Sequence, residues 1–234
     1  MAGDSAAFKH HFYQIEADRN FLWFFVPFTN REVLAVLDTW AVDMERIARN
    51  VSSPHLALIK WQWWRDEIAK IYAGNTTVGN PLLEKLSFII RQYNLPAHEF
   101  DNVLTGLSQL VISDPPTEVG DALKKAGVYE THLMHLKMRV IMADKQHETN
   151  LWDYAAQRYA VMEYALREKL PRDINRALVK YVEDGKRLTT GHTYARAMDA
   201  MAVLRATALI KADCNQSRLK PIPFKELRVW WRAR

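Results

Sequence analysis

The sequence holds a single cysteine, Cys214, and only 8 glycines among 234 residues. One cysteine excludes an internal disulfide framework and suits a reducing compartment. We expect Cys214 to be a packed thiol rather than a nucleophile. The longest apolar run, LWFFVPF at 22–28, has seven residues and includes a proline, far short of the ~20 residues of a membrane-spanning helix.

Excess charge is also missing from most of the chain. The formal net charge is +5, and residues 215–234 supply all of it, with six basic side chains against one acidic side chain. A nucleic-acid groove across the body would need distributed basic residues, so nucleic acid is not an expected partner of the body. A basic C-terminal segment fits an acidic protein, RNA or anionic lipid, or else a solvated tail.

Residues that start and stop helices are present in quantity. Thr29 and Glu32 have the spacing of a capping box, Ser53-Pro54 and Asn80-Pro81 place proline after an N-cap residue, and Gly74 is a stop signal. We therefore expect helices over about 29–50, 54–72, from 81, 96–113, 117–145 with a break near 127, 149–169, 171–186, 192–212 and 224–232. The sequence predicts an all-α fold with one compact multi-helix domain over 1–234, including a basic aromatic segment at 215–234.

The stretch KWQWWRDEI at 60–68 has three tryptophans in four residues. Its helix carries two neighbouring apolar stripes, the first made of Trp61, Trp64, Ile68 and Ile71 and the second of Leu56, Ile59 and Trp63. We interpret the first stripe as core and the second as a widening of the same buried face. A base-stacking platform, the alternative, would need aromatic residues interleaved with basic residues on an open surface.

A family resemblance rests on WQWWRDEIAKIYAGN, NPLLEKL and YNLPAHEFDNVLTG, which follow one another in the chain. These segments resemble the squalene/phytoene synthase family, which has the all-α isoprenoid synthase fold. The resemblance extends upstream through ADRNFLWFFVPFTNREVLAVLDTW; it is good over 17–112, fair over 150–234 and poor between. The C-terminal KPIPFKELRVWWRAR is similar to a mostly proteobacterial and mitochondrial branch of that family.

Active members of this family carry two aspartate-rich helical motifs. Each aspartate pair, at i and i+4, can hold Mg²⁺ against the substrate's diphosphate. The resemblance places Ala48 and Ser52 at the first pair, with Arg49 adjacent, and Glu168 and Arg172 at the second. It therefore implies a pseudoenzyme with no catalytic residues, no metal site and no cofactor.

The branch with the similar C-terminus includes mitochondrial factors needed to assemble respiratory complex I. The resemblance implies an assembly factor or accessory subunit on the matrix side of the inner membrane, or in an alphaproteobacterial cytoplasm. Its partners would be subunits of complex I, of another respiratory complex or of ATP synthase. One alternative is a divergent Mg²⁺-dependent prenyl-diphosphate transferase using Asp38, Asp43, Glu168 and Asp173. An RNA-associated protein is a third interpretation.

The C-terminal segment is the candidate docking element for a partner or an anionic membrane. Tryptophan and arginine are favoured interface anchors, and basic aromatic helices suit the membrane interface. The competing interpretation is that the segment closes the core. The candidate docking residues are Phe224, Leu227, Arg228, Trp230, Trp231 and Arg232.

His132 and His135 form a second candidate group. Their i, i+3 spacing on a helix is acceptable for metal ligands, and Glu130 and His147 are nearby in the sequence. Since the sequence places no second ligand pair, we expect polar-surface or hydrogen-bonded core histidines here and no metal.

Overall fold

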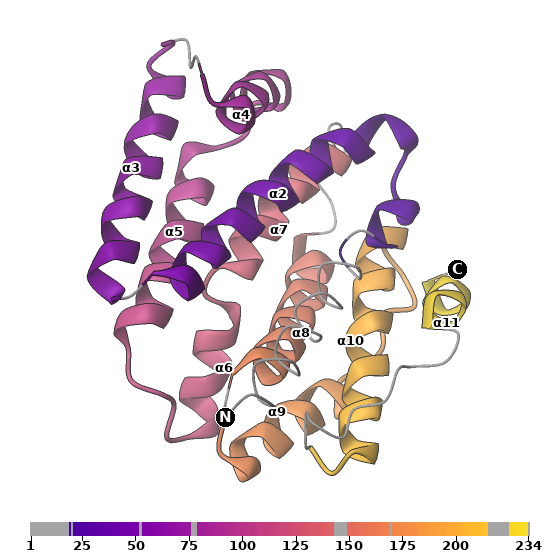
Figure 1. Ribbon diagram of the computed structural model, residues 1–234. Helices are drawn as coiled ribbons and strands as arrows, with labels where there is room; N and C mark the ends of the chain where they lie inside the picture. Colours follow the sequence, from indigo (N-terminus) through magenta and orange to yellow (C-terminus); the bar gives the residue numbers. More distant parts are fainter. Residues whose placement is uncertain are drawn as a thin grey trace. The chain divides into compact units, whose positions relative to one another are not determined.

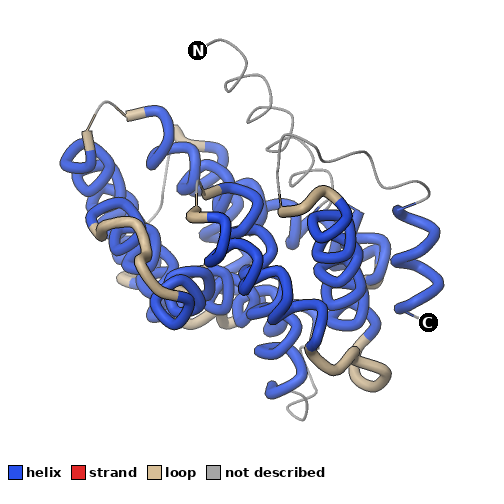
Figure 2. Tube along the Cα trace, turned by 90° about the horizontal axis from the view of Figure 1, so that it is seen from below, coloured by secondary structure: helices blue, strands red, loops and turns tan. Residues whose placement is uncertain are grey.

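The computed structural model consists of helices and loops over the residues it describes, which are 19, 21–51, 53–75, 79–142, 149–168, 170–214 and 225–233 (Figures 1 and 2). No strand occurs in these residues, which confirms the predicted all-α class. The elements are the short 3-10 helix η1 (Trp23–Phe25) and the α-helices α2 (Phe28–Asn50), α3 (Pro54–Tyr72), α4 (Pro81–Tyr93), α5 (Ala97–Ile112), α6 (Val119–Gly127), α7 (Glu130–Ile141), α8 (Thr149–Arg167), α9 (Arg172–Asp184), α10 (Thr193–Lys211) and α11 (Lys225–Ala233).

Most helix ends lie close to the residues that the sequence analysis identifies as helix starts and stops. Asn80 caps α4, because its side-chain oxygen accepts hydrogen bonds from the backbone N–H groups of Leu82 and Leu83. Gly74 follows α3 with φ +85, a conformation that disfavours other residues. The capping box at Thr29 is wrong: α2 begins at Phe28, and the Thr29 hydroxyl donates to the side-chain oxygen of Asn30.

The helices fall into two compact units, which we describe separately. Unit 1 comprises 1–26, 115–127 and 147–234, and therefore holds η1, α6 and α8–α11. Unit 2 comprises 27–114 and 128–146, and holds α2–α5 and α7. The chain thus passes from one unit to the other four times.

The core of unit 2 forms where α2 packs against α3, α5 and α7, with α5 also in contact with α3 and α7 (Figure 1). The first tryptophan stripe is buried as predicted. Trp61 is fully buried, and its indole N–H donates to the carbonyl oxygen of Met44 in α2 at 3.2 Å. Trp40 of α2 and Phe100 of α5 meet edge to face with ring centroids 5.1 Å apart.

The second tryptophan stripe is not part of this core. Leu56, Ile59 and Trp63 are 43%, 52% and 45% exposed, so the prediction that they widen the buried face is wrong. The neighbours of α3 are α2, α4 and α5, and they cover the first stripe. A repeat of apolar residues in the sequence shows which residues share a face, but it does not show how many neighbours the helix has.

Gly106 of α5 lies against the backbone that leads into α7. A Cβ atom at this position would lie 2.4 Å from the carbonyl oxygen of Val128 and 3.0 Å from the Cβ atom of Tyr129. Such distances are far below van der Waals contact, so only glycine permits this approach. The close packing holds the N-terminal part of α7 beside α5.

In unit 1, α10 is the central helix. It contacts α8, α9 and α11, and 13 of its 19 residues are buried. Buried charges are paired here, with Arg19 donating to Glu163 at 3.1 Å and Arg158 contacting Asp199 of α10. Cys214, just beyond α10, is buried, as expected for a packed thiol.

Candidate functional site

The C-terminal part of α2 occupies the place of the first expected aspartate motif. Ala48 and Arg49 are half-buried there, and Ser52 lies outside the described residues. Arg49 Nη2 lies 3.9 Å from a carboxylate oxygen of Glu45, one turn earlier. Glu45 is itself buried, and it accepts a hydrogen bond from the Tyr129 hydroxyl at 3.2 Å. The nearest buried acid is therefore engaged by a cation and a hydroxyl group.

The region between α8 and α9 occupies the place of the second expected motif. Glu168 is exposed just after α8, and Asp173 is exposed in the first turn of α9. Arg172 forms an ion pair with Asp213, and Arg176 reaches the same carboxylate at 2.9 Å. The Asp213 carboxylate is thus neutralised by two guanidinium groups, and Arg172 places a cation where the motif would need a carboxylate, which disfavours Mg²⁺.

The displaced acids of α2 do not form a pair either. Asp38 is 4% exposed, and its carboxylate lies 2.5 Å from the ammonium group of Lys137 on α7. Asp43 is on the helix surface, where its partner is Arg46 at 3.4 Å. The two carboxylates thus have separate cationic partners and different environments.

Helix α11 lies where the basic aromatic segment was predicted, and it packs on α10 (Figure 1). Its described buried residues are Val229 and Ala233, which are one helical turn apart. They do not belong to the predicted apolar stripe, so the contact with α10 uses residues that the sequence analysis did not single out. Phe224 lies outside the described residues, as do the side chains of Leu227, Trp230 and Trp231. Arg228 and Arg232 are exposed.

The exposed arginines of α11 have a third cation beside them. Partial burial lowers the pKa of Arg232, and the positive charges of Arg187 and Arg228 lower it further. Arg187 is exposed in the loop between α9 and α10. We call Arg187, Arg228 and Arg232 the basic patch. Neighbouring like charges disfavour one another until an anionic group neutralises them, so the patch is a candidate anion-docking surface within unit 1.

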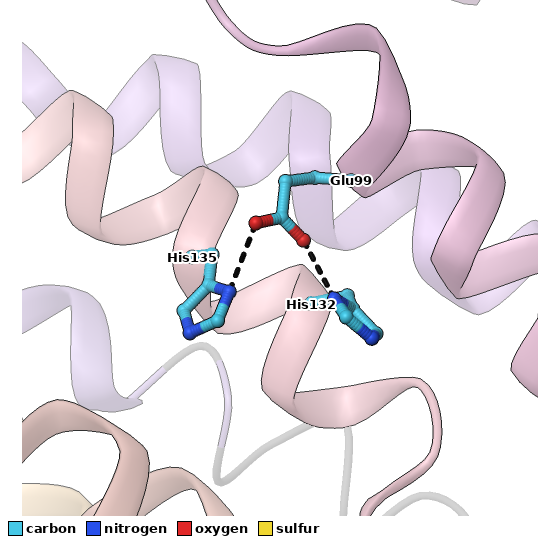
Figure 3. A group of neighbouring side chains, drawn as sticks. All are labelled: Glu99, His132 and His135. Atoms are coloured by element: carbon cyan, nitrogen blue, oxygen red, sulfur yellow. Dashed lines mark hydrogen bonds and ion pairs between the residues drawn. The ribbon is translucent and has the colours of Figure 1, made fainter. Parts of the chain in front are cut away.

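A carboxylate and two imidazoles meet between α5 and α7 (Figure 3). His132 and His135 lie on α7, and their Nδ1 atoms are 2.6 Å and 2.9 Å from the two oxygens of Glu99 on α5. We call these residues the Glu99 cluster. Of the two residues close to these histidines in the sequence, Glu130 is a buried residue of α7, and His147 lies outside the described residues. The actual third member comes from another helix.

The Glu99 cluster is held in a defined protonation pattern. Burial raises the pKa of the Glu99 carboxyl, but hydrogen bonds and positive charge from His132 and His135 outweigh burial and lower it to about 2. Glu99 is therefore an ionised acceptor near neutral pH, so each Nδ1 atom carries the hydrogen that it donates. The expectation of hydrogen-bonded histidines is borne out by this geometry.

Comparisons with known proteins support the family resemblance. Residues 17–119 match the family model for squalene/phytoene synthase, which identifies a squalene/phytoene synthase family domain in that part of the chain. The match covers the segment over which the quoted motifs resemble the family best, and the all-α fold is consistent with the family's isoprenoid synthase fold. Searches find no significant match to a curated protein or to a solved structure.

Hydropathy adds one further finding. Among the helices of the described residues, none combines the length and the apolar character of a membrane-spanning segment.

Proposed function

We propose that this chain is a non-catalytic squalene/phytoene synthase-like protein that binds subunits of a mitochondrial membrane complex, as an assembly factor or accessory subunit. Respiratory complex I is the first candidate partner, and another respiratory complex or ATP synthase is the second. The mitochondrial setting rests on the similarity of residues 220–234 to one branch of the family. An alphaproteobacterial cytoplasm is the alternative setting.

One observation carries the non-catalytic part of the proposal: a cation stands beside the first aspartate motif and at a position of the second. Arg49 follows Ala48 at the first, and Arg172 occupies the second while paired with Asp213. Mg²⁺ requires hard oxygen ligands, commonly carboxylates, beside the diphosphate. The nearby acids Asp38 and Glu45 are buried in contacts with Lys137 and Tyr129. Their carboxylates serve packing within unit 2.

The basic patch supports a docking role. Its three guanidinium groups are exposed on unit 1, and two of them lie on α11 one turn apart. Arginine forms bidentate contacts with carboxylates and is frequent among interface anchors. We assign the patch to an acidic surface of a partner subunit on the matrix side of the inner membrane.

We predict that exchanging Arg228 and Arg232 for glutamate weakens association with the partner complex by more than about tenfold, since like charges brought together across a protein interface cost several kcal/mol. The measurement is the amount of chain that migrates with the complex after size fractionation of native membranes. Lys85→Glu/Lys180→Glu is the matched control, because both lysines are exposed and the charge change is equal. Equal loss in both variants, or no loss in either, would place docking elsewhere.

The alternative function, Mg²⁺-dependent prenyl transfer, has its own test. Calorimetry with farnesyl diphosphate should give no heat that depends on Mg²⁺, because Arg49 stands beside the first expected aspartate pair and Arg172 occupies a position of the second. A clear Mg²⁺-dependent signal that disappears in Asp43→Ala or Glu168→Ala would establish the enzyme interpretation instead. Asp184→Ala, on the exposed end of α9, serves as the control for loss of an acid.

A further inference from the structure

We propose that Glu99, His132 and His135 form a binding site for a divalent transition-metal ion, best suited to Zn²⁺, which ties α5 to α7 within unit 2. This site is unrelated to the diphosphate motifs, which would use carboxylates and Mg²⁺. It also stands apart from the proposed function, because the docking test concerns a different unit and different residues.

The geometry brings three ligand atoms close together. The carboxylate oxygen and the two imidazole nitrogens lie within 4.8 Å of one another. Ligands around a tetrahedral Zn²⁺ with bonds of 2.0–2.1 Å are about 3.3 Å apart. The observed separations of 2.6 Å and 2.9 Å between Glu99 oxygens and Nδ1 atoms are slightly shorter, so small ring movements would admit an ion.

Protons hold the cluster together without a metal. Each imidazole donates its Nδ1–H to the Glu99 carboxylate (Figure 3). Metal binding takes the place of the two Nδ1 hydrogens: a neutral ring then carries its hydrogen on Nε2, whereas an imidazolium ring releases its Nδ1 proton to solvent. In both cases the Nδ1 lone pair faces the ion. No redox step is involved.

The ligand set selects the kind of metal. Imidazole nitrogen suits Zn²⁺ and its first-row neighbours, whereas Mg²⁺ and Ca²⁺ prefer oxygen throughout. Two imidazoles with one carboxylate are a known Zn²⁺ ligand set that leaves a position for water or another ligand. Sequence spacing alone could not assign it, because Glu99 is separated from His132 by 33 residues.

The cluster is anchored on one side and open on the other. Glu99 is 8% exposed, so the packing of α5 holds its carboxylate in place. The side chains of His132 and His135 are 32% and 24% exposed, which gives an ion access from solvent. The exposed His98 has its Nε2 atom 3.5 Å from Glu99 and stands near the open side.

The test is a Zn²⁺ titration by calorimetry of the full chain after chelator treatment, with Co²⁺ absorption to report coordination. We expect one ion per chain and a higher melting temperature with Zn²⁺. His132→Gln and His135→Gln should each weaken binding at least about tenfold, and glutamine preserves a side-chain N–H for Glu99. His55→Gln, on the exposed N-terminal turn of α3, is the matched control.

Two results would overturn the proposal. One is the absence of a one-to-one Zn²⁺ isotherm in the parent protein. The other is binding that survives unchanged in the His132→Gln/His135→Gln double variant, which would assign the ion to other histidines. Circular dichroism establishes that each variant is folded. Glu99→Gln removes the carboxylate ligand and should weaken Zn²⁺ binding independently of the histidine variants.

Discussion

Replacing Trp64 with alanine should lower the free energy of unfolding by ~3–5 kcal/mol, as for other large truncations in protein cores. Trp64 is only 7% exposed, and it lies on the buried face of α3 together with Trp61 and Ile68. Its removal leaves a cavity that α2 and α5 cannot fully close. Urea unfolding monitored by circular dichroism measures the effect, and the melting temperature should fall by about 6–20 °C.

The neighbouring Trp63 offers a control with the same chemical change. It is 45% exposed and touches Trp64 edge to face, with ring centroids 5.2 Å apart. Trp63→Ala should therefore cost only about 1 kcal/mol, the worth of one aromatic pair. Equal costs for the two variants would contradict the division of α3 into a buried stripe and an exposed stripe. A stable Trp64→Ala protein that loses a partner would make the buried stripe an interface.

Replacing Lys137 with methionine should be about as damaging as the loss of Trp64. The Lys137 ammonium is 1% exposed and lies 2.5 Å from the carboxylate of Asp38, which is also buried. Methionine keeps most of the volume of lysine but leaves a buried carboxylate without this cation. Removing one member of a buried ion pair typically costs ~3–5 kcal/mol, which urea unfolding would detect.

The double variant Asp38→Ala/Lys137→Met separates charge from packing. Once both charges are gone, no uncompensated ion remains in the contact between α2 and α7, so most of the lost stability should return. A double variant that is less stable than Lys137→Met would show that packing around Asp38 dominates. That outcome would contradict a purely electrostatic origin of the effect.

Local chemistry explains why the helix boundaries were predictable from sequence. Asn80 and Pro81 set the start of α4, and Gly74 sets the end of α3, because these residues act through their own backbone conformation and immediate neighbours. Thr29 failed as a cap for a related reason. The extended Pro27 precedes α2 directly and starts the helix one residue before the threonine.

Long-range packing explains what sequence analysis missed. Trp63 and Trp64 are adjacent and chemically identical, yet their exposures differ because neighbouring helices cover one side of α3. Glu99 and Arg187 join groups whose other members lie more than thirty residues further along the chain. No local sequence pattern indicates that Glu99 or Arg187 belongs to these groups. Only the contact of α5 with α7, and the placement of the loop before α10, bring these groups together.

The repeated passage of the chain between its two units has a consequence for synthesis on the ribosome. All helices of unit 2 have been synthesised once α7 is complete. By contrast, α6 of unit 1 packs against α8 and α9, which are synthesised only afterwards. Chains emerge at roughly 5–20 residues per second. Unit 2 can therefore fold first, before the helices that pack against α6 have been synthesised. Nascent-chain folding should therefore proceed from the middle of the sequence outward.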